Sequence, residues 1–183
     1  LKKIKKFVLY IIAICILFYA CKAALTYLYP LKYIDIVKTN CEKYNIDPLL
    51  IVAVIKAESN FDDKATSKKS AKGLMQVRDD TALWCAEKMN INLNTENLYD
   101  GETNIKIGTW YFDYLINHFN GNLDVCLAAY NAGMGNVTKW LDNNNYSSDG
   151  VNLSHIPFGE TKKYINKVKN NYKIYKFLYE KEI

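Results

Sequence analysis

The chain has no acidic residue in its first thirty positions. Five lysines stand there: Lys2, Lys3, Lys5, Lys6 and Lys22. They account for the formal net charge of +5, because residues 31–183 hold 19 basic and 19 acidic residues. A domain that binds nucleic acid needs a basic surface of its own. The neutral balance therefore predicts no nucleic-acid partner, and the lysine-rich stretch 162–181 is interpreted as a solvated helix face.

Motifs for phosphates and metals are also missing. There is no glycine-rich phosphate loop, and His118 and His155 have no Cys, Asp or His partner at a ligand-like spacing. Cys41, Cys85 and Cys126 are an odd number of thiols without a metal-binding spacing, and each lies in an apolar helical pattern. We expect no metal, no cofactor and three buried thiols, with a Cys85–Cys126 disulfide as the alternative.

The alternating pattern of strands is nearly absent, and only residues 66–77 could form a short hairpin. Elsewhere apolar residues recur at helical spacing. The helices expected outside the N-terminal segment are 31–44, 47–59, 79–89, 102–119, 123–132, 137–141 and 160–179. Asp79 or Asp80 is expected to cap the third of them. The prediction is an all-α fold with six or seven helices around residues 49–58, without repeats or a second domain.

The N-terminal segment has the pattern of a membrane anchor. Residues 1–6 are a basic flank, and residues 7–21 are fifteen residues without a charge. A span needs about 20 residues, and Lys22 can extend toward the lipid surface, so residues 7–29 could cross. We interpret them as an uncleaved signal anchor, with the N-terminus in the cytoplasm and residues 31–183 outside. The alternatives are a cleaved signal peptide, although no small-residue cleavage site is evident, or a lipidated Cys21.

Residues 47–61 are the centre of the domain. Asp47 can cap a helix, and Pro48 suits its first position. An apolar run follows and ends in Glu58, which shares a helix face with three apolar residues, Ile51, Val54 and Ile55. Burial raises the pKa of a carboxyl group, and an acid that stays protonated near neutral pH can act as a general acid. The alternative is that Glu58 is a solvated residue at a frayed helix end.

Other polar residues interrupt apolar stretches further along the chain. Gln76 is the one amide in the stretch GLMQV, and Tyr130 and Asn131 interrupt the small residues of AAYNAG. Glu160 and Tyr164 lie one turn apart at the start of the last helix. A glycan would supply hydrogen-bond partners for such groups. Taken singly, Tyr130 could equally be a core residue, and Glu160 could serve the helix dipole.

Together these motifs resemble the catalytic domain of the soluble lytic transglycosylases, which is related in fold to goose-type lysozyme. The matching motifs are Glu58-Ser59-x-Phe61, Ser70-Ala71-x-Gly73-Leu74-Met75-Gln76-Val77, Asn104-Ile105-x-x-Gly108 with Tyr114-Leu115, Ala128-Ala129-Tyr130-Asn131-Ala132-Gly133, and Ile156-Pro157 with Glu160-Thr161-x-x-Tyr164. They follow the order of the family and cover roughly residues 40–175. The few departures, such as Ile165 and the Phe158-Gly159 pair, leave the chemistry intact and the substrate preference open.

The resemblance implies that residues 31–183 are a catalytic domain that acts on glycan strands of peptidoglycan. It implies cleavage of the β-1,4 bond between N-acetylmuramic acid and N-acetylglucosamine, with Glu58 as acid and then base and a 1,6-anhydro sugar as product. The substrate-binding residues that it implies are Ser59, Met75, Gln76, Tyr130, Asn131, Glu160 and Tyr164. In that family Ser59 and Tyr130 would lie near the reacting sugar, and Met75 would pack against it.

Two other functions remain open at this stage. A hydrolytic lysozyme of the same fold would need a second carboxylate, for which Asp62, Asp63 and Glu160 are candidates. A membrane-anchored module could instead bind peptidoglycan without cleaving it, as the scaffold of an envelope complex. Whether cleavage is exo or endo depends on whether loops such as 142–154 close the groove.

Overall fold

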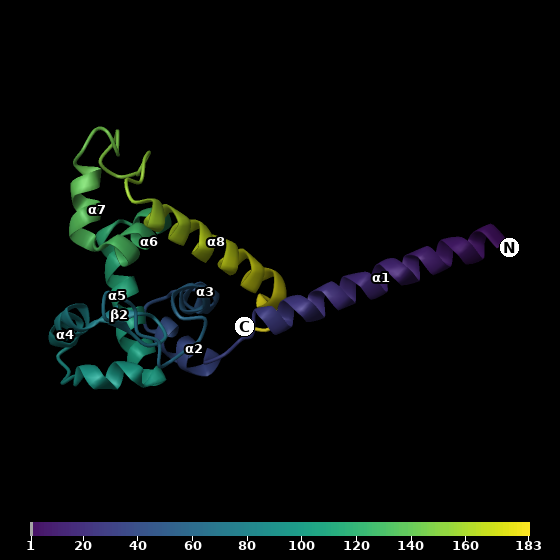
Figure 1. The fold of residues 1–183 in the computed structure, drawn as a ribbon, viewed down its shortest axis with the longest axis horizontal. Helices are drawn as coiled ribbons and strands as arrows, with labels where there is room; N and C mark the ends of the chain where they lie inside the picture. The colour runs from purple at the N-terminus through teal and green to yellow at the C-terminus, as the bar shows by residue number, and fades with distance from the viewer. Residues whose placement is uncertain (1) are drawn as a thin grey trace.

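The structure, a computed structural model, describes residues 2–183. A long N-terminal helix leads into a helical domain with one small hairpin (Figure 1). The elements are α1 (Lys2–Leu28), α2 (Ile34–Glu42), α3 (Pro48–Glu58), β1 (Ala71–Lys72), β2 (Val77–Arg78), α4 (Asp79–Lys88), η1 (Thr95–Tyr99), α5 (Gly101–His118), α6 (Leu123–Ala132), α7 (Met134–Leu141) and α8 (Gly159–Tyr179). The predicted all-α class with a small hairpin is confirmed.

Helix α3 forms the centre of the core. The predicted cap is present, because the backbone N–H of Leu49 donates to Asp47 Oδ1 at 2.9 Å and Pro48 opens the helix. Every residue of α3 from Leu49 to Ala57 is buried except Lys56. A helix that is apolar on all sides needs neighbours on all sides. Glu58, the last residue of this buried helix, is therefore held in a fixed place.

Helix α8 packs against α3 and is hydrogen-bonded to it at both ends and in the middle of α3. Tyr172 Oη donates to the Asp47 carboxylate at the start of α3. Asn171 Nδ2 donates to the carbonyl of Ala53 at 3.3 Å, in the middle. Lys167 Nζ donates to the carbonyl of Ala57 at 2.6 Å, next to Glu58. These bonds fix the register of the two helices, whose residues are more than a hundred positions apart in sequence.

A buried asparagine fixes the hairpin on the domain. Strands β1 and β2 pair antiparallel, and the turn between them lies against η1 and α5. Asn104 of α5 is fully buried, and its Nδ2 donates to the carbonyls of Lys72 and Leu98 at 2.9 and 2.8 Å. Its Oδ1 accepts the backbone N–H of Met75 at 2.7 Å. The Asn104 side chain thus uses both of its N–H donors and one of its two acceptor lone pairs to hold this turn.

Two glycines allow the turn to lie this close. Gly73 has φ +72°, and a Cβ there would lie 2.2 Å from the carbonyl oxygen of Leu98. Gly108 of α5 faces Met75, whose sulfur would lie 2.5 Å from a Cβ at that position. A side chain at either position would push the turn away from α5. Close packing of the turn against η1 and α5 therefore explains why glycine occupies both positions.

Some local predictions were wrong. Arg78, not an aspartate, is the N-cap of α4, and no side chain caps the helix. Asp79 and Asp80 lie inside the first turn, where Asp80 accepts the N–H of Thr81 and pairs with Arg78 at 3.0 Å. Helix α7 begins at Met134 rather than 137, because Gly133 with φ +89° lets the chain turn and restart at once. The 3₁₀ helix η1 lies between the expected helices 79–89 and 102–119, where the sequence predicted no helix.

The three domain cysteines are buried and free, as expected from the pattern. Burial raises the pKa of the Cys41, Cys85 and Cys126 thiols to about 12. Cys15 and Cys21 are exposed on α1. Within residues 2–183 no group of three or more His, Cys, Asp or Glu side chains is arranged to hold a metal ion.

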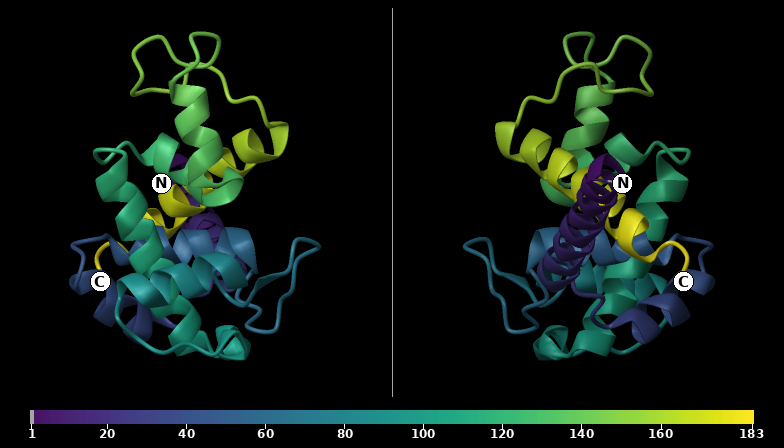
Figure 2. Two further views of the ribbon diagram at one scale, coloured as in Figure 1. Left: turned by 90° about the vertical axis from the view of Figure 1, so that its left-hand side faces the viewer. Right: turned by 90° about the vertical axis from the view of Figure 1, so that its right-hand side faces the viewer.

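Helix α1 extends away from the domain and is exposed along nearly its whole length (Figures 1 and 2). Residues Lys3–Leu28 are long and apolar enough to cross a membrane by length and composition. At 1.5 Å per residue they reach about 39 Å, more than the roughly 30 Å of a hydrocarbon core. Residues 2–6 of the predicted basic flank and residues 7–28 of the predicted apolar segment thus form one continuous helix, and residue 1 lies outside the described residues.

We expect Asn104→Ala to lower the free energy of unfolding by about 3 kcal/mol, because it leaves two buried carbonyls and one buried N–H without partners. Urea unfolding of the full chain in detergent, followed by tryptophan fluorescence, measures the change. Asn144→Ala in the exposed 142–154 loop is the matched control and should change little. Equal stability of the two variants would contradict the role given to Asn104.

Candidate active site

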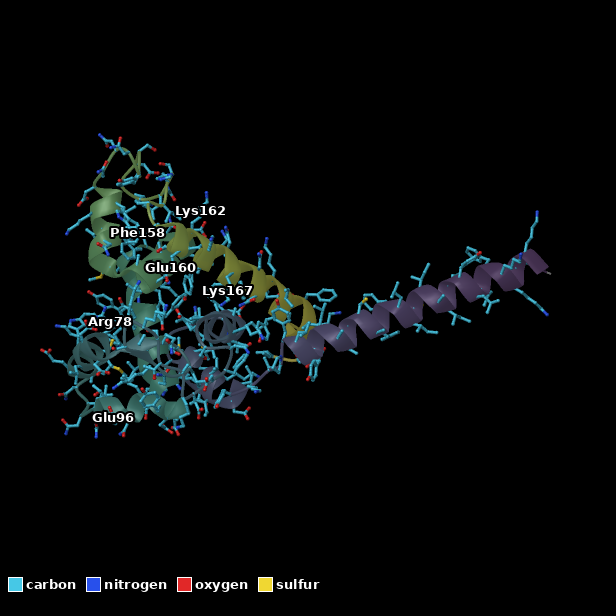
Figure 3. The ribbon with its side chains drawn as sticks, viewed as in Figure 1. Arg78, Glu96, Phe158, Glu160, Lys162 and Lys167 are labelled. Carbon is cyan, nitrogen blue, oxygen red and sulfur yellow. The ribbon has the colours of Figure 1, made fainter. Side chains whose placement is uncertain are left out.

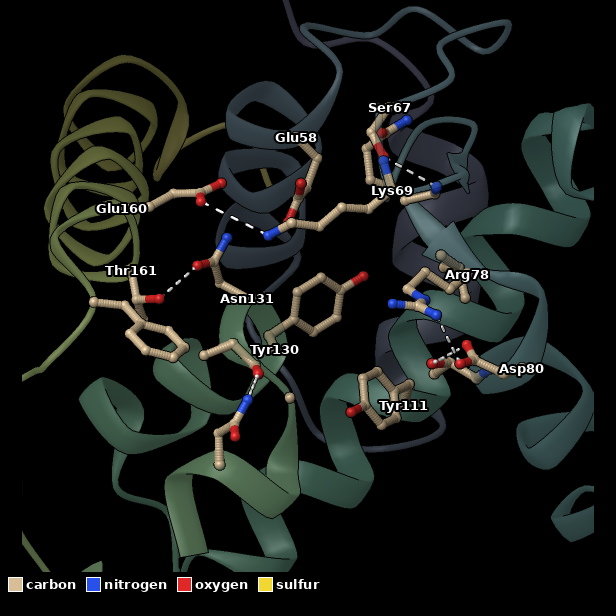
Figure 4. A pocket seen from close by; sticks show the side chains of 18 of the residues that line it. Glu58, Ser67, Lys69, Arg78, Asp80, Tyr111, Tyr130, Asn131, Glu160 and Thr161 are labelled. Atoms are coloured by element: carbon tan, nitrogen blue, oxygen red, sulfur yellow. Dashed lines mark hydrogen bonds and ion pairs between the residues drawn. The ribbon is translucent and has the colours of Figure 1, made fainter. Parts of the chain in front are cut away.

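A groove of about 830 Å³ crosses the domain at the end of α3 (Figure 4). Its walls come from the loop before β1, from the β2–α4 junction, from α5 and α6, and from the start of α8. Five predicted site residues line it: Glu58, Gln76, Tyr130, Asn131 and Glu160. The fold thus brings together residues that are up to a hundred positions apart in the sequence.

Glu58 lies in the groove with an altered acidity. Burial raises the pKa of its carboxyl group from 4.5 to about 7, and the nearby Glu160 adds to the rise. The hydroxyl of Tyr164 and the cation of Lys167 act in the opposite direction. Glu58 still has a partly exposed side chain, so it can reach a ligand. A carboxyl group with this pKa is protonated in a large fraction of molecules at neutral pH and can donate a proton.

Two residues of α8 lie next to Glu58. The Tyr164 side chain is buried, and its hydroxyl has no hydrogen-bond partner among the described residues. The hydroxyl lies close enough to Glu58 to lower the pKa of that carboxyl group, while burial and then the Glu58 carboxylate raise the pKa of Tyr164. Lys167, bound to the Ala57 carbonyl, is a cation whose charge lowers the pKa of Glu58. Both residues favour the ionised form of Glu58. Glu58 takes this form once it has donated its proton, so both residues would stabilise it after proton transfer.

Tyr130 and Asn131 lie side by side at the end of α6. Tyr130 Oη donates to the carbonyl of Met75 at 2.8 Å, which joins α6 to the hairpin turn. Asn131 Oδ1 accepts from Thr161 Oγ1 at 2.8 Å, which joins α6 to α8. The Asn131 amide nitrogen makes no hydrogen bond within the described chain, so its two donors can bind a ligand in the groove.

Gln76 occupies the turn between the strands in a left-handed conformation with φ +48°. Its Nε2 donates to the carbonyls of Ala65 and Gly73 at 3.1 and 2.9 Å. Both amide donors are therefore used inside the fold. A ligand would bind Gln76 through the amide oxygen.

Three predicted site residues lie behind the groove rather than in its wall. Ser59 Oγ donates to the carbonyl of Leu74 at 2.9 Å, and Tyr164 lies beneath Glu58. Met75 is fully buried against Gly108, so in this structure its side chain cannot pack against a sugar in the groove. The backbone of Met75, bound by Asn104 and Tyr130, instead supports the groove floor.

Several groove residues were not predicted. Lys69 Nζ lies 3.7 Å from Glu160 Oε2, and this ion pair spans the groove in front of Glu58 (Figure 4). Both side chains are about three-quarters exposed, so the pair is weak and a ligand can displace it. Arg78 and Tyr111 line the opposite wall. Arg78 is the one arginine of the sequence, but the residues around it form no motif that would have predicted a site.

The other carboxylates that were considered for a second catalytic acid lie elsewhere. Asp62 Oδ1 accepts the backbone N–H of Lys64 at 3.0 Å, and Asp63 pairs with the Lys64 side chain at 3.9 Å. Neither lines the groove. Glu160 is the carboxylate that shares the groove wall with Glu58 and influences its pKa. Figure 3 shows Glu160 at the first turn of α8, with Arg78 on the far side of the groove.

The sequence matches the family model described as "Transglycosylase SLT domain" over residues 35–152. The "Soluble lytic murein transglycosylase" of Escherichia coli K12 is 36% identical over 143 residues, which are 76% of this chain and 22% of that protein. The "Membrane-bound lytic murein transglycosylase C" of Edwardsiella ictaluri is 31% identical over 167 residues, or 79% of this chain and 46% of that protein. The chain thus spans between a fifth and a half of the length of these relatives.

Solved structures agree with the sequence match. The 70 kDa soluble lytic transglycosylase of Escherichia coli superposes with a TM-score of 0.74 at 32% identity, over 84% of this chain and 25% of that one. An inactive glutamate-to-glutamine mutant of the lytic transglycosylase Slt of Pseudomonas aeruginosa gives a TM-score of 0.73 at 29% identity over the same shares. The predicted lysozyme-like helical fold is confirmed.

Removing either group that favours the ionised form should raise the Glu58 pKa further. We expect Tyr164→Phe, which removes the hydroxyl donor, and Lys167→Met, which removes the cation, each to shift the titration of Glu58 upward. A carbon-13 NMR titration of the glutamate side chains measures this. Lys162→Met on the exposed face of α8 is the control, and an unchanged Glu58 pKa in Tyr164→Phe would refute the contact.

The raised pKa also predicts how stability depends on pH. The folded protein resists ionisation of Glu58 more than the unfolded chain does, so the free energy of unfolding falls as the pH rises from 4.5 to 7. Glu58→Gln removes this loss, and the variant should exceed wild type by about 3 kcal/mol near pH 8 and match it near pH 4. Glu87→Gln on exposed α4 is the control. A difference that does not grow with pH would argue against a buried acid.

Proposed function

The chain belongs to the Transglycosylase SLT domain family, and from this premise we propose that it is a membrane-anchored lytic transglycosylase that cleaves peptidoglycan. The proposed reaction cuts the β-1,4 bond between N-acetylmuramic acid and N-acetylglucosamine and leaves a 1,6-anhydro end. In this proposal residues 1–6 are a cytoplasmic flank, 7–29 a signal anchor and 31–183 the catalytic domain. The observation on which the proposal depends most is the Glu58 carboxyl group, held in the groove with a pKa of about 7.

The proposed reaction needs one group to act as acid and then as base. Protonated Glu58 donates to the glycosidic oxygen as the bond from that oxygen to C1 of the muramyl sugar breaks. The C6 hydroxyl of the same sugar then attacks C1, and its proton returns to the Glu58 carboxylate. No water is consumed, and an internal nucleophile avoids the entropy cost of positioning a separate molecule. A pKa near 7 suits both halves of the cycle.

The surroundings of Glu58 fit these steps. Tyr164 and Lys167 stabilise the carboxylate that remains after the first proton transfer. Burial, with a smaller contribution from Glu160 in the same wall, raises the pKa of Glu58 and so favours the protonated acid before the reaction. We propose that Asn131 donates to an N-acetyl or hydroxyl oxygen of the glycan, and that Gln76 accepts through its amide oxygen. Tyr130 would line the reacting sugar's subsite, while Ser59 and Met75 support the turn below it.

The anchoring part of the proposal is supported by α1 and by a relative whose name includes "membrane-bound". The basic residues before the apolar segment favour a cytoplasmic N-terminus, because cytoplasmic flanks are enriched in lysine and arginine. The domain would then face the side of the membrane on which peptidoglycan lies.

We expect Glu58→Gln to fold normally and to lose cleavage of purified peptidoglycan by about a thousand-fold, because the amide cannot donate the catalytic proton. Mass spectrometry of released fragments from the full chain in detergent measures both the rate and the product. Glu87→Gln, far from the groove on α4, is the matched control and should cleave as wild type does.

The products separate the proposal from its alternatives. Anhydro-muramyl ends from wild type, absent with Glu58→Gln, support the lytic reaction. Reducing ends, about one water heavier, would indicate a hydrolytic lysozyme in which Glu160 positions water. Binding of glycan without any fragment would indicate the scaffold, and near wild-type cleavage by Glu58→Gln would remove Glu58 from the mechanism.

A further inference from the structure

The C-terminal end of α1 is bound to the domain rather than joined by a free linker. The last carbonyls of a helix have no partner within the helix. Here Tyr179 Oη donates to the carbonyl of Tyr29 at 2.8 Å, and Lys56 Nζ donates to that of Leu28 at 2.7 Å. The Lys56 cation also lies 5.2 Å from the centre of the Tyr29 ring. A cation at this end of a helix is favoured by the helix dipole.

A second tyrosine of α8 completes the junction. Tyr175 Oη donates to the carbonyl of Pro30 at 3.2 Å, and its ring meets that of Tyr29 edge-on at 5.6 Å between centres. Tyr175 is fully buried and Tyr179 nearly so. The last two turns of α8 are therefore fixed beside the end of α1, as Figures 1 and 2 both show.

The length of α1 sets where the lipid surface would lie. A hydrocarbon core of about 30 Å takes about 20 residues of helix, which residues 7–26 supply. Tyr27 and Tyr29 then lie at the level of the lipid headgroups, where tyrosine is favoured. Because Tyr179 is hydrogen-bonded to Tyr29, the end of α8 must lie at the same level.

At this end of α8, the face turned away from Tyr175 and Tyr179 has an unusual composition for a surface exposed to water. Phe177 is 61% exposed, more than any other large apolar side chain of residues 31–183. Lys173 lies one helical turn before it on the exposed face of α8, and Lys181 follows in the exposed turn just after the helix ends at Tyr179. Lys176 pairs with Glu180 at 2.8 Å, and Glu182 follows as a further acid near this end. An aromatic ring between two lysines is typical of a surface that enters the headgroup layer of a membrane.

We propose that Lys173 and Phe177 of α8, with Lys181 just past its end, form a stripe that rests in the headgroup layer of the same bilayer that α1 crosses. Phe177 inserts its ring at the boundary of the acyl chains, and the two lysines bind anionic phospholipid headgroups. This inference rests on the proposed anchoring by α1. The domain is then held to the bilayer at two points, the span and the stripe, so its orientation is fixed. Figure 3 shows Lys162 and Lys167 further up α8, away from this end.

The test places a fluorescent label on the stripe in the full chain. Cys15→Ser and Cys21→Ser remove the exposed thiols, and the three buried thiols, with pKa values of about 12, stay unlabelled in the folded protein. Phe177→Cys in this background is labelled with bimane and reconstituted into vesicles of phosphatidylglycerol and phosphatidylethanolamine that contain brominated lipids. Leu83→Cys on α4, 50% exposed, is the matched control.

We expect lipid-borne bromine to quench the label at position 177 at least twice as strongly as the label at position 83. Equal quenching at the two positions would overturn the proposal. A second variant keeps Cys15, replaces Cys21 with serine and carries the bimane label on Cys15. Its quenching shows whether α1 lies in the bilayer. Strong quenching at Cys15 with none at position 177 refutes the stripe and leaves the anchor standing, whereas no quenching at Cys15 removes the anchor and with it this inference.

The role of the lysines is tested by Lys173→Glu with Lys181→Glu. The double change should reduce quenching at position 177 at least two-fold in vesicles that contain phosphatidylglycerol, because anionic headgroups then repel the stripe. Lys162→Glu with Lys163→Glu, at the far end of α8, is the charge-matched control. Unchanged quenching in the first pair would overturn the binding of headgroups by these lysines.

Discussion

Removal of one carboxyl group from water at the end of an apolar helix is the constraint on which the rest of this structure depends. Helix α3 can bury Glu58 because nearly every residue before it is already buried. The same burial that makes α3 the core thus produces an acid with a pKa of about 7. Such a group costs free energy when ionised, and the cost is offset by packing elsewhere, above all along α8. Lys167 and Tyr164, both on α8, limit this cost, so one helix supports both the core and the acid.

The second wall of the groove depends on a single turn. Residues 73–76 have little regular structure of their own, but three side chains from three helices bind their backbone: Ser59 from the end of α3, Asn104 from α5 and Tyr130 from α6. A turn held in this way can expose Gln76 in a left-handed conformation that would otherwise be costly. Residues that a sequence motif marks as substrate contacts can therefore also stabilise the fold. Substitutions at Ser59 or Tyr130 would affect both the stability of the turn and the shape of the groove.

Sequence patterns predicted the helices well where apolar periodicity is strong, and α6 has the predicted bounds. They also singled out Glu58 and the polar residues that share its groove. They could not predict that Met75 turns inward, because an apolar side chain suits a core and a sugar face equally, and the choice depends on the space that Gly108 leaves. Nor could they predict Lys69 opposite Glu160 or Lys167 beside Glu58. Those contacts join segments that are distant in sequence, and a lysine in a loop or on a helix has no local pattern that names its partner.

Helix α8 extends from the groove, where Glu160 lies in its first turn, to the end of α1, where Tyr179 is bound. Nineteen residues at 1.5 Å each separate the two positions by about 28 Å. Since both ends are fixed by packing, α8 holds the end of α1 and the Glu58 carboxyl group at a constant distance. In the proposed function, a glycan strand would meet Glu58 only at the distance from the anchor that this helix sets. Inserting or deleting one turn of α8 would change the distance between the end of α1 and Glu58 by about 5 Å. In the proposed function, helix length would therefore help to set which glycan strands the acid meets, beside the chemistry of the groove.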